Sequence, residues 1–195
     1  MKKLNLILTF VIALIFTVNG FSKTASDGFS IGQPVADFTI TNYDGADYTL
    51  SKSGANYTVI IFMSTQCPFV QPYTDRINNL VSEFGSNGVA IWGINSNKTE
   101  STEDVIAHAK DKGYNFPILK DNNNVVADLF AAEKTPEVFV IKNSDMTLVY
   151  HGRIDDDKEA DKVTVSDLQL TLASLNSDQA VPVSQTKAFG CSIKR

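Results

Sequence analysis

The stretch that decides the fold reads Tyr57-Thr58-Val59-Ile60-Ile61-Phe62-Met63-Ser64-Thr65-Gln66-Cys67-Pro68-Phe69-Val70. Its first seven residues are rich in β-branched and aromatic side chains, which predicts a buried strand that ends at Ser64. From Phe69 on, apolar residues recur at three- and four-residue spacing until Gly85, a pattern typical of an amphipathic helix. Cys67 is therefore expected in the joint between strand and helix.

This position favours a reactive cysteine. Free backbone N–H groups and the positive end of a helix dipole both stabilise a thiolate, so the pKa of Cys67 is expected below the ordinary value of about 8.5. The alternative is that Cys67 is a small buried hydrophobic residue, as many lone cysteines are.

Strand, cysteine, proline and helix together resemble the active-site turn of the thioredoxin fold in its peroxiredoxin-like (AhpC/TSA, redoxin) branch. Cys67-Pro68-Phe69-Val70 stands where thioredoxins carry C-x-x-C, so the neighbouring second cysteine is missing. Ser64 fills the hydroxyl position of the peroxiredoxin motif, and Ile60 stands at its proline position. The resemblance implies a central mixed β-sheet flanked by helices, with Cys67 as nucleophile and Ser64 beside it.

The other elements alternate between strands and helices, which is the signature of an α/β domain. Phe38 and Ile40 before the Asp44-Gly45 turn, with Tyr48 and Leu50 after it, predict an N-terminal hairpin. Periodicity and capping residues predict strands at 89–95, 137–141 and 148–154, the last two as an antiparallel hairpin, and helices at 101–113, 125–132 and 165–176.

Thr135-Pro136 directly precedes a predicted strand. The resemblance implies that this X-Pro bond is cis and faces the active-site cysteine. A proline without an N–H bends the chain there and leaves the backbone of Thr135 free to bind a substrate or the sulfur. Thr135, Pro136 and Pro68 are thus the expected substrate-binding residues.

The chain ends on Gly190-Cys191-Ser192-Ile193-Lys194-Arg195, and its last 16 residues show no periodicity. The ending resembles a subgroup of peroxiredoxin-like proteins that close on G-C-S-I-K. Three interpretations of Cys191 stay open: it resolves an intermediate on Cys67 from within the chain or from a partner subunit, it forms a structural disulfide, or it is free beside a one-cysteine mechanism.

The first 20 residues differ in kind from the rest. Lys2 and Lys3 precede an apolar stretch of about 15 residues, shorter than the roughly 20 that span a bilayer, and small or polar residues follow. We expect a secretory signal at 1–20 cleaved near Gly20, a linker at 21–30, a redoxin domain at 31–179 and a tail at 180–195. The protein is then periplasmic or secreted.

The expected function is that of a thiol-dependent oxidoreductase with antioxidant, peroxidase-like or disulfide-exchange activity. A peroxide or a disulfide is its substrate and an external thiol its reductant, with no cofactor and no metal. Arg153 is a further candidate, either near Cys67 or paired with Asp155 or Asp156. The formal charge of −5 argues against nucleic-acid binding.

Two other classes stay open. The chain could be a non-catalytic domain that holds partner segments in the groove around Thr135-Pro136. It could also be a copper carrier, because Sco-like proteins are similar in fold and bind copper with C-x-x-x-C and a distant histidine. Here Cys67 and His151 would be ligands, whereas Gln71 stands at the second cysteine position.

Overall fold

The computed structural model describes residues 28–195. The expected signal peptide and its cleavage site near Gly20 lie outside the described residues. The strands are β1 (Thr39–Thr41), β2 (Asp47–Thr49), β3 (Tyr57–Met63), β4 (Val89–Asn95), β5 (Ile118–Lys120), β6 (Lys134–Thr135), β7 (Glu137–Lys142), β8 (Thr147–Gly152) and β9 (Cys191–Ser192), and the α-helices are α1 (Thr74–Phe84), α2 (Thr102–Lys112), α3 (Val125–Phe130) and α4 (Asp167–Asn176).

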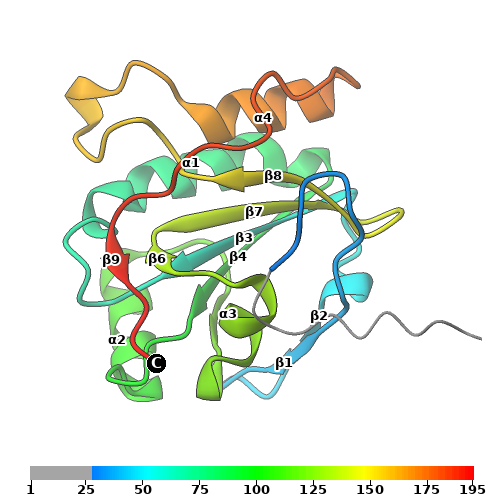
Figure 1. Ribbon diagram of the computed structural model, residues 1–195. Coiled ribbons are helices and arrows are strands. Elements are labelled where there is room, and N and C mark those ends of the chain that lie inside the picture. The colour runs from blue at the N-terminus through cyan, green and yellow to red at the C-terminus, as the bar shows by residue number, and fades with distance from the viewer. Residues whose placement is uncertain (1–27) are drawn as a thin grey trace, which may run out of the picture.

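The centre of the molecule is a five-stranded mixed sheet of order β5-β4-β3-β7-β8 (Figure 1). β3 lies in the middle, parallel to β4 and antiparallel to β7, and β7 and β8 form the expected antiparallel hairpin. β1 and β2 pair as a separate hairpin, and β6 pairs with β9. Six of the seven β3 residues are buried, as expected for a strand covered on both faces.

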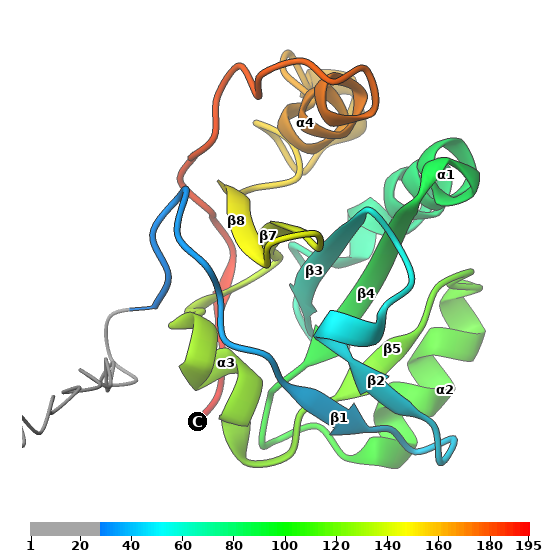
Figure 2. The ribbon, with the colours of Figure 1, turned by 90° about the vertical axis from the view of Figure 1, so that its right-hand side faces the viewer.

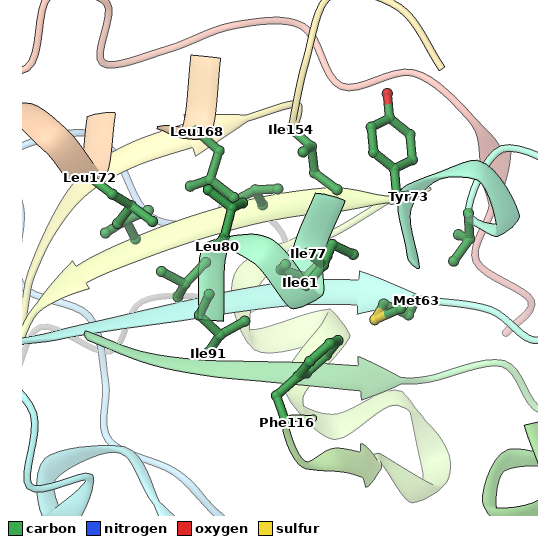
Figure 3. Packing of buried hydrophobic residues seen from close by; sticks show 14 of the residues in the cluster. Ile61, Met63, Tyr73, Ile77, Leu80, Ile91, Phe116, Ile154, Leu168 and Leu172 are labelled. Atoms are coloured by element: carbon green, nitrogen blue, oxygen red, sulfur yellow. The ribbon is translucent and has the colours of Figure 1, made fainter. Parts of the chain in front are cut away.

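Two hydrophobic clusters cover the two faces of the sheet. On one face α1, α2 and α4 pack against β3, β4, β7 and β8, and Figure 3 shows Ile77 and Leu80 of α1 beside Leu168 and Leu172 of α4. On the other face α3 and the β1–β2 hairpin cover the alternate residues of the same strands, an arrangement visible in Figure 2. No helix among residues 28–195 is long and apolar enough to cross a membrane.

The helix after Cys67 begins later than the sequence pattern indicates. Val70 N donates to Cys67 O at 3.0 Å and Tyr73 N to Val70 O at 2.9 Å, so two tight turns, the second at the 3₁₀ segment Gln71–Tyr73, precede α1. Pro68 and Pro72 carry no N–H. Cys67 is therefore not at the N-terminus of an α-helix, and the helix-dipole argument for its reactivity is wrong.

The last 16 residues also differ from the expected tail without regular structure. They run along β8, where His151 N donates to Ser184 O and Thr186 N to His151 O, both at 3.0 Å. They then add β9 beside β6 (Figure 1). Two residues of strand are too short to give a periodic sequence signal.

Candidate active site

Cys67 lies just beyond the end of the central strand β3, and its side chain is only 2% exposed. Its Sγ is 3.2 Å from the backbone carbonyl oxygen of Thr135. The Thr135-Pro136 peptide bond is cis, as expected, and it sits beside the cysteine. Pro68 follows the cysteine and is exposed. The structure thus brings together Cys67, Thr135 and Pro136.

Cys191, near the C-terminal end of the chain, lies at the same site as Cys67 and Thr135. In the antiparallel pair of β6 and β9, Cys191 lies opposite Thr135 and Ser192 opposite Lys134. Ile193 N extends the pairing by donating to Glu133 O at 2.9 Å. The Cys191 thiol hydrogen-bonds Cys67, and no disulfide joins them. Two cysteines that are 124 positions apart in the sequence therefore meet at one site.

Their shared environment separates the two pKa values. Burial alone would raise the pKa of Cys67, but hydrogen bonds from the Cys191 thiol, the Thr135 side chain and the Phe69 backbone hold it below its ordinary value. The Thr135 hydroxyl is buried and has no other partner among the described residues. Burial, the hydrogen bond to Cys67 and its charge raise the pKa of Cys191 to about 11. Of the two thiols, Cys67 is therefore the one that ionises more readily, with Cys191 as a hydrogen-bond donor to its thiolate.

Close packing holds the C-terminal segment beside Cys67. Phe189 packs edge-on against Phe69 of the cysteine turn, with ring centroids 6.3 Å apart. Gly190 has φ +143° and passes so close to the Thr135 carbonyl oxygen that any Cβ would collide with it. The last residue, Arg195, binds Asp128 Oδ1 at 2.8 Å through Nε and Ala132 O at 2.6 Å through an Nη.

The Ser64 hydroxyl points to a carboxylate. It is buried and donates to Glu100 Oε1 at 2.5 Å, and it accepts from Gln66 N at 3.2 Å. Its proton is therefore engaged with Glu100, and the groups that lower the pKa of Cys67 are those of Cys191, Thr135 and Phe69.

Arg153 is paired with α4. Its Nε donates to Asp167 Oδ2 at 2.7 Å, and Asp167 is buried. Asp155 instead binds Arg76 of α1. Neither of the two acids proposed from the sequence is thus the direct partner of Arg153. Its ion-pair partner is Asp167 at the start of α4.

His151 lies on β8, where its Nε2 is 2.8 Å from Glu137 Oε1 and its ring stacks on Phe139 at 4.2 Å. The other Glu137 oxygen accepts from the backbone N–H groups of Glu133 and Lys134. Within residues 28–195, no group of three or more His, Cys, Asp or Glu side chains is placed to hold a metal ion.

The sequence profile of the AhpC/TSA family matches residues 31–151, which is more than half of the chain and includes β1 to β8 up to His151. The chain belongs to the AhpC/TSA family. Thiol-disulfide oxidoreductase ResA of Bacillus subtilis is 25% identical over 70% of this chain and 75% of its own length.

Solved structures agree with this assignment. A hypothetical protein from Sinorhizobium meliloti is 31% identical with a TM-score of 0.78, covering 87% of this chain and 96% of that chain. The thioredoxin domain of a thiol-disulfide oxidoreductase from Bacteroides vulgatus is 14% identical with a TM-score of 0.56, covering 64% and 89%. The fold of this AhpC/TSA member is thioredoxin-like, and it is a thioredoxin-fold redoxin.

Sequence reasoning missed Glu100, the buried partner of Ser64. A signal was present: the polar run Asn95-Ser96-Asn97-Lys98-Thr99-Glu100 begins at the last residue of a buried strand. Since β3 and β4 are parallel, the residues after both strands meet at one edge of the sheet. The polar run could therefore have been placed beside Ser64.

Proposed function

We propose that this AhpC/TSA protein is a thiol–disulfide oxidoreductase in which Cys67 is the nucleophile and Cys191 the resolving thiol. The observation that carries the proposal is the position of Cys191, which lies opposite Thr135 in the β6–β9 pair, while the carbonyl oxygen of Thr135 is 3.2 Å from Cys67 Sγ. The lowered pKa of Cys67 and the raised pKa of Cys191 support it. The similarity to thiol-disulfide oxidoreductase ResA of Bacillus subtilis supports a disulfide as substrate.

The reaction has two exchange steps. The Cys67 thiolate attacks one sulfur of a substrate disulfide, forming a mixed disulfide and releasing the other substrate sulfur as a thiolate, which takes a proton. Cys191 then attacks Sγ of Cys67, forming the Cys67–Cys191 disulfide and releasing the second substrate thiol. The substrate gains two electrons and the protein loses two. An external thiol reductant returns the protein to its dithiol form.

The two pKa values order these steps. Burial, together with the hydrogen bond and the charge of the Cys67 thiolate, keeps Cys191 protonated. Once Cys67 is in a mixed disulfide, that negative charge is gone, and the pKa of Cys191 falls toward its ordinary value. Cys191 thus becomes a better nucleophile only after Cys67 has reacted.

Disulfide exchange fits this site better than peroxide reduction. Ser64 and Arg153, the two groups that could polarise a peroxide, are both bound to carboxylates, those of Glu100 and Asp167. The groups around Cys67 favour a thiolate, which both reactions require, so the preference for exchange rests on the engagement of Ser64 and Arg153. A signal at 1–20 would place this chemistry outside the cytosol, where disulfides persist.

A comparison of two oxidants tests the proposal. Reduced protein is mixed with equal amounts of oxidised glutathione or hydrogen peroxide, and the loss of alkylatable protein thiols and the intact mass of the protein are followed over time. We expect faster oxidation by glutathione disulfide, with two glutathione molecules released for each protein, and no reaction of the Cys67→Ser variant.

Each other result would contradict the proposal in its own way. Faster reaction with peroxide and a sulfenic acid on Cys67 would make the protein a peroxidase. Inertness toward both oxidants would indicate a non-catalytic binding domain. Stoichiometric Cu(I) binding by the inert protein, lost in Cys67→Ser and His151→Ala, would indicate a copper carrier.

A further inference from the structure

A buried carboxylate lies behind the cysteine turn. Glu100 is 2% exposed and sits in the loop between β4 and α2. Its Oε1 accepts from Ser64 Oγ at 2.5 Å and Asn97 Nδ2 at 2.7 Å. Its Oε2 accepts from Thr65 N at 2.7 Å and Asn95 Nδ2 at 2.5 Å. The four donors match the capacity of an ionised carboxylate, and although burial raises the pKa of Glu100, these bonds hold it below its ordinary value.

One set of these bonds fixes the residues that precede Cys67. Glu100 binds the Ser64 hydroxyl and the Thr65 N–H, and the Ser64 hydroxyl in turn accepts from Gln66 N. All three residues before the cysteine are therefore tied, directly or through Ser64, to one carboxylate. The position of Cys67 follows from that attachment.

The other set fixes the residues that follow Cys191. Asn97 gives its Nδ2 to Glu100, and its Oδ1 accepts from Lys194 N at 2.7 Å. Lys98 N also donates to Lys194 O at 3.0 Å. Lys194 lies three residues after Cys191. The side chain that Glu100 orients thus holds the segment that carries the second cysteine.

We propose that Glu100 is a positioning residue that holds the segments of Cys67 and Cys191 in register, and so sets how readily their disulfide forms. Glu100 touches neither sulfur. It acts through Ser64 and Thr65 on one side and through Asn97 on the other. The inference rests on the proposed function, because it concerns the disulfide of that reaction.

Glutamine cannot replace Glu100 here. Placed at Oε2, the new amide nitrogen would face Thr65 N and Asn95 Nδ2, which are both donors. The Asn95 amide cannot turn round freely, since its Oδ1 accepts from Lys120 Nζ at 2.9 Å. Placed at Oε1, the amide would face Asn97 Nδ2, whose own Oδ1 is bound to Lys194 N. At Oε2 the amide opposes two donors in a buried site, and at Oε1 it opposes Asn97 Nδ2 and forces the Ser64 hydroxyl to turn away from its present partner.

The test is the effective concentration of the two thiols, which states how much more readily Cys67 and Cys191 form a disulfide with each other than two glutathione molecules do. It is measured by equilibrating the protein with reduced and oxidised glutathione. Glu100→Gln should lower it by about tenfold or more, the scale on which misplaced reacting groups lose intramolecular advantage. Asp121→Asn is the matched control. Asp121 is also buried, but its side chain binds Ser96 Oγ and the N–H groups of Val126 and Ala127, none of which belongs to either cysteine segment. Its variant should unfold more easily with an unchanged effective concentration.

Single-arm variants make the test independent of how well Glu100→Gln folds. Ser64→Ala removes the Ser64 bond to Glu100 and leaves the bond from Thr65 N, and Asn97→Ala removes the side-chain bond to Lys194 N and leaves the backbone bond from Lys98 N. Each should lower the effective concentration alone, and neither should lower it further in the Glu100→Gln background.

Two results would overturn the inference: an effective concentration in Glu100→Gln equal to that of the wild type or of Asp121→Asn, and additive effects of the single-arm variants. Failure of the proposed function would look different, because then the wild-type protein itself would form no Cys67–Cys191 disulfide.

Discussion

Replacing Cys191 with alanine is expected to trap Cys67 as a stable mixed disulfide and to raise the pKa of Cys67. With one equivalent of oxidised glutathione, the variant should gain the mass of one bound glutathione, whereas the wild type should lose only the mass of two hydrogen atoms. No other cysteine exists in the chain to release the intermediate. The pKa should rise because the Cys191 thiol is a main donor to the Cys67 thiolate, while burial continues to oppose ionisation.

The sign of the pH effect follows from linkage. A depressed pKa of Cys67 stabilises the folded protein above the ordinary cysteine pKa of about 8.5, and this stabilisation is lost as the pH falls through the depressed value. Between those two values the wild type holds a thiolate and Cys191→Ala holds a larger share of thiol. Ultraviolet thiolate absorbance against pH measures this directly, with Cys67→Ser as the baseline.

Cys191→Ser separates the two roles of the residue. Its hydroxyl can still donate to the Cys67 thiolate but cannot resolve a mixed disulfide. We therefore expect Cys191→Ser to trap glutathione as Cys191→Ala does, while keeping a depressed pKa at Cys67. An unchanged pKa in Cys191→Ala would contradict the hydrogen-bond account. Release of glutathione from either variant without added thiol would contradict the resolving role.

Gly190→Ala is expected to detach the C-terminal strand from Cys67. The new methyl group would collide with the Thr135 carbonyl oxygen, and φ +143° is a backbone conformation open essentially to glycine. Formation of the Cys67–Cys191 disulfide should slow by about 100-fold, the scale of a misplacement of about 1 Å between reacting groups. The measurement is the rate at which the mixed disulfide with glutathione converts to the intramolecular disulfide.

Gly45→Ala is the matched control for this substitution. Gly45 lies in the β1–β2 turn at φ +80°, and an added Cβ would meet no atom within 4 Å. Alanine at this positive φ destabilises the folded protein by about 1–3 kcal/mol. The substitution causes no collision and lies away from the cysteines. In Gly45→Ala the Cys67–Cys191 disulfide should form at the wild-type rate. Equal rates in Gly190→Ala and Gly45→Ala would show that docking of β9 does not position Cys191.

The sequence predicts the sheet well because its strands leave strong local signals. Both seven-residue runs, at β3 and β4, have the expected bounds, and α2 has the expected Ser101 cap and Gly113 end. The start predicted for α1 is too early, because the consecutive turns around Pro68 and Pro72 have the apolar spacing of a helix but lack α-helical hydrogen bonds. Local patterns identify elements but not the tight turns between them.

The site could be predicted only in part. Cys67, Thr135 and Pro136 follow from the resemblance to a known turn and do meet in space. The pairing of Cys191 with Thr135 could not be derived, because a two-residue strand has no pattern and its register depends on contacts with distant residues. The partners of Ser64 and Arg153 likewise lie 36 and 14 positions away in the chain.

The central claim is that Cys67 and Cys191 form a reversible disulfide within one chain, and a peptide map under non-reducing conditions tests it most directly. After one equivalent of oxidised glutathione, we predict a linked peptide that contains both cysteines and disappears with mild reductant. Cys191 that remains open to alkylation in the fully oxidised protein would contradict the claim, as would a link present before oxidation that survives the same reductant.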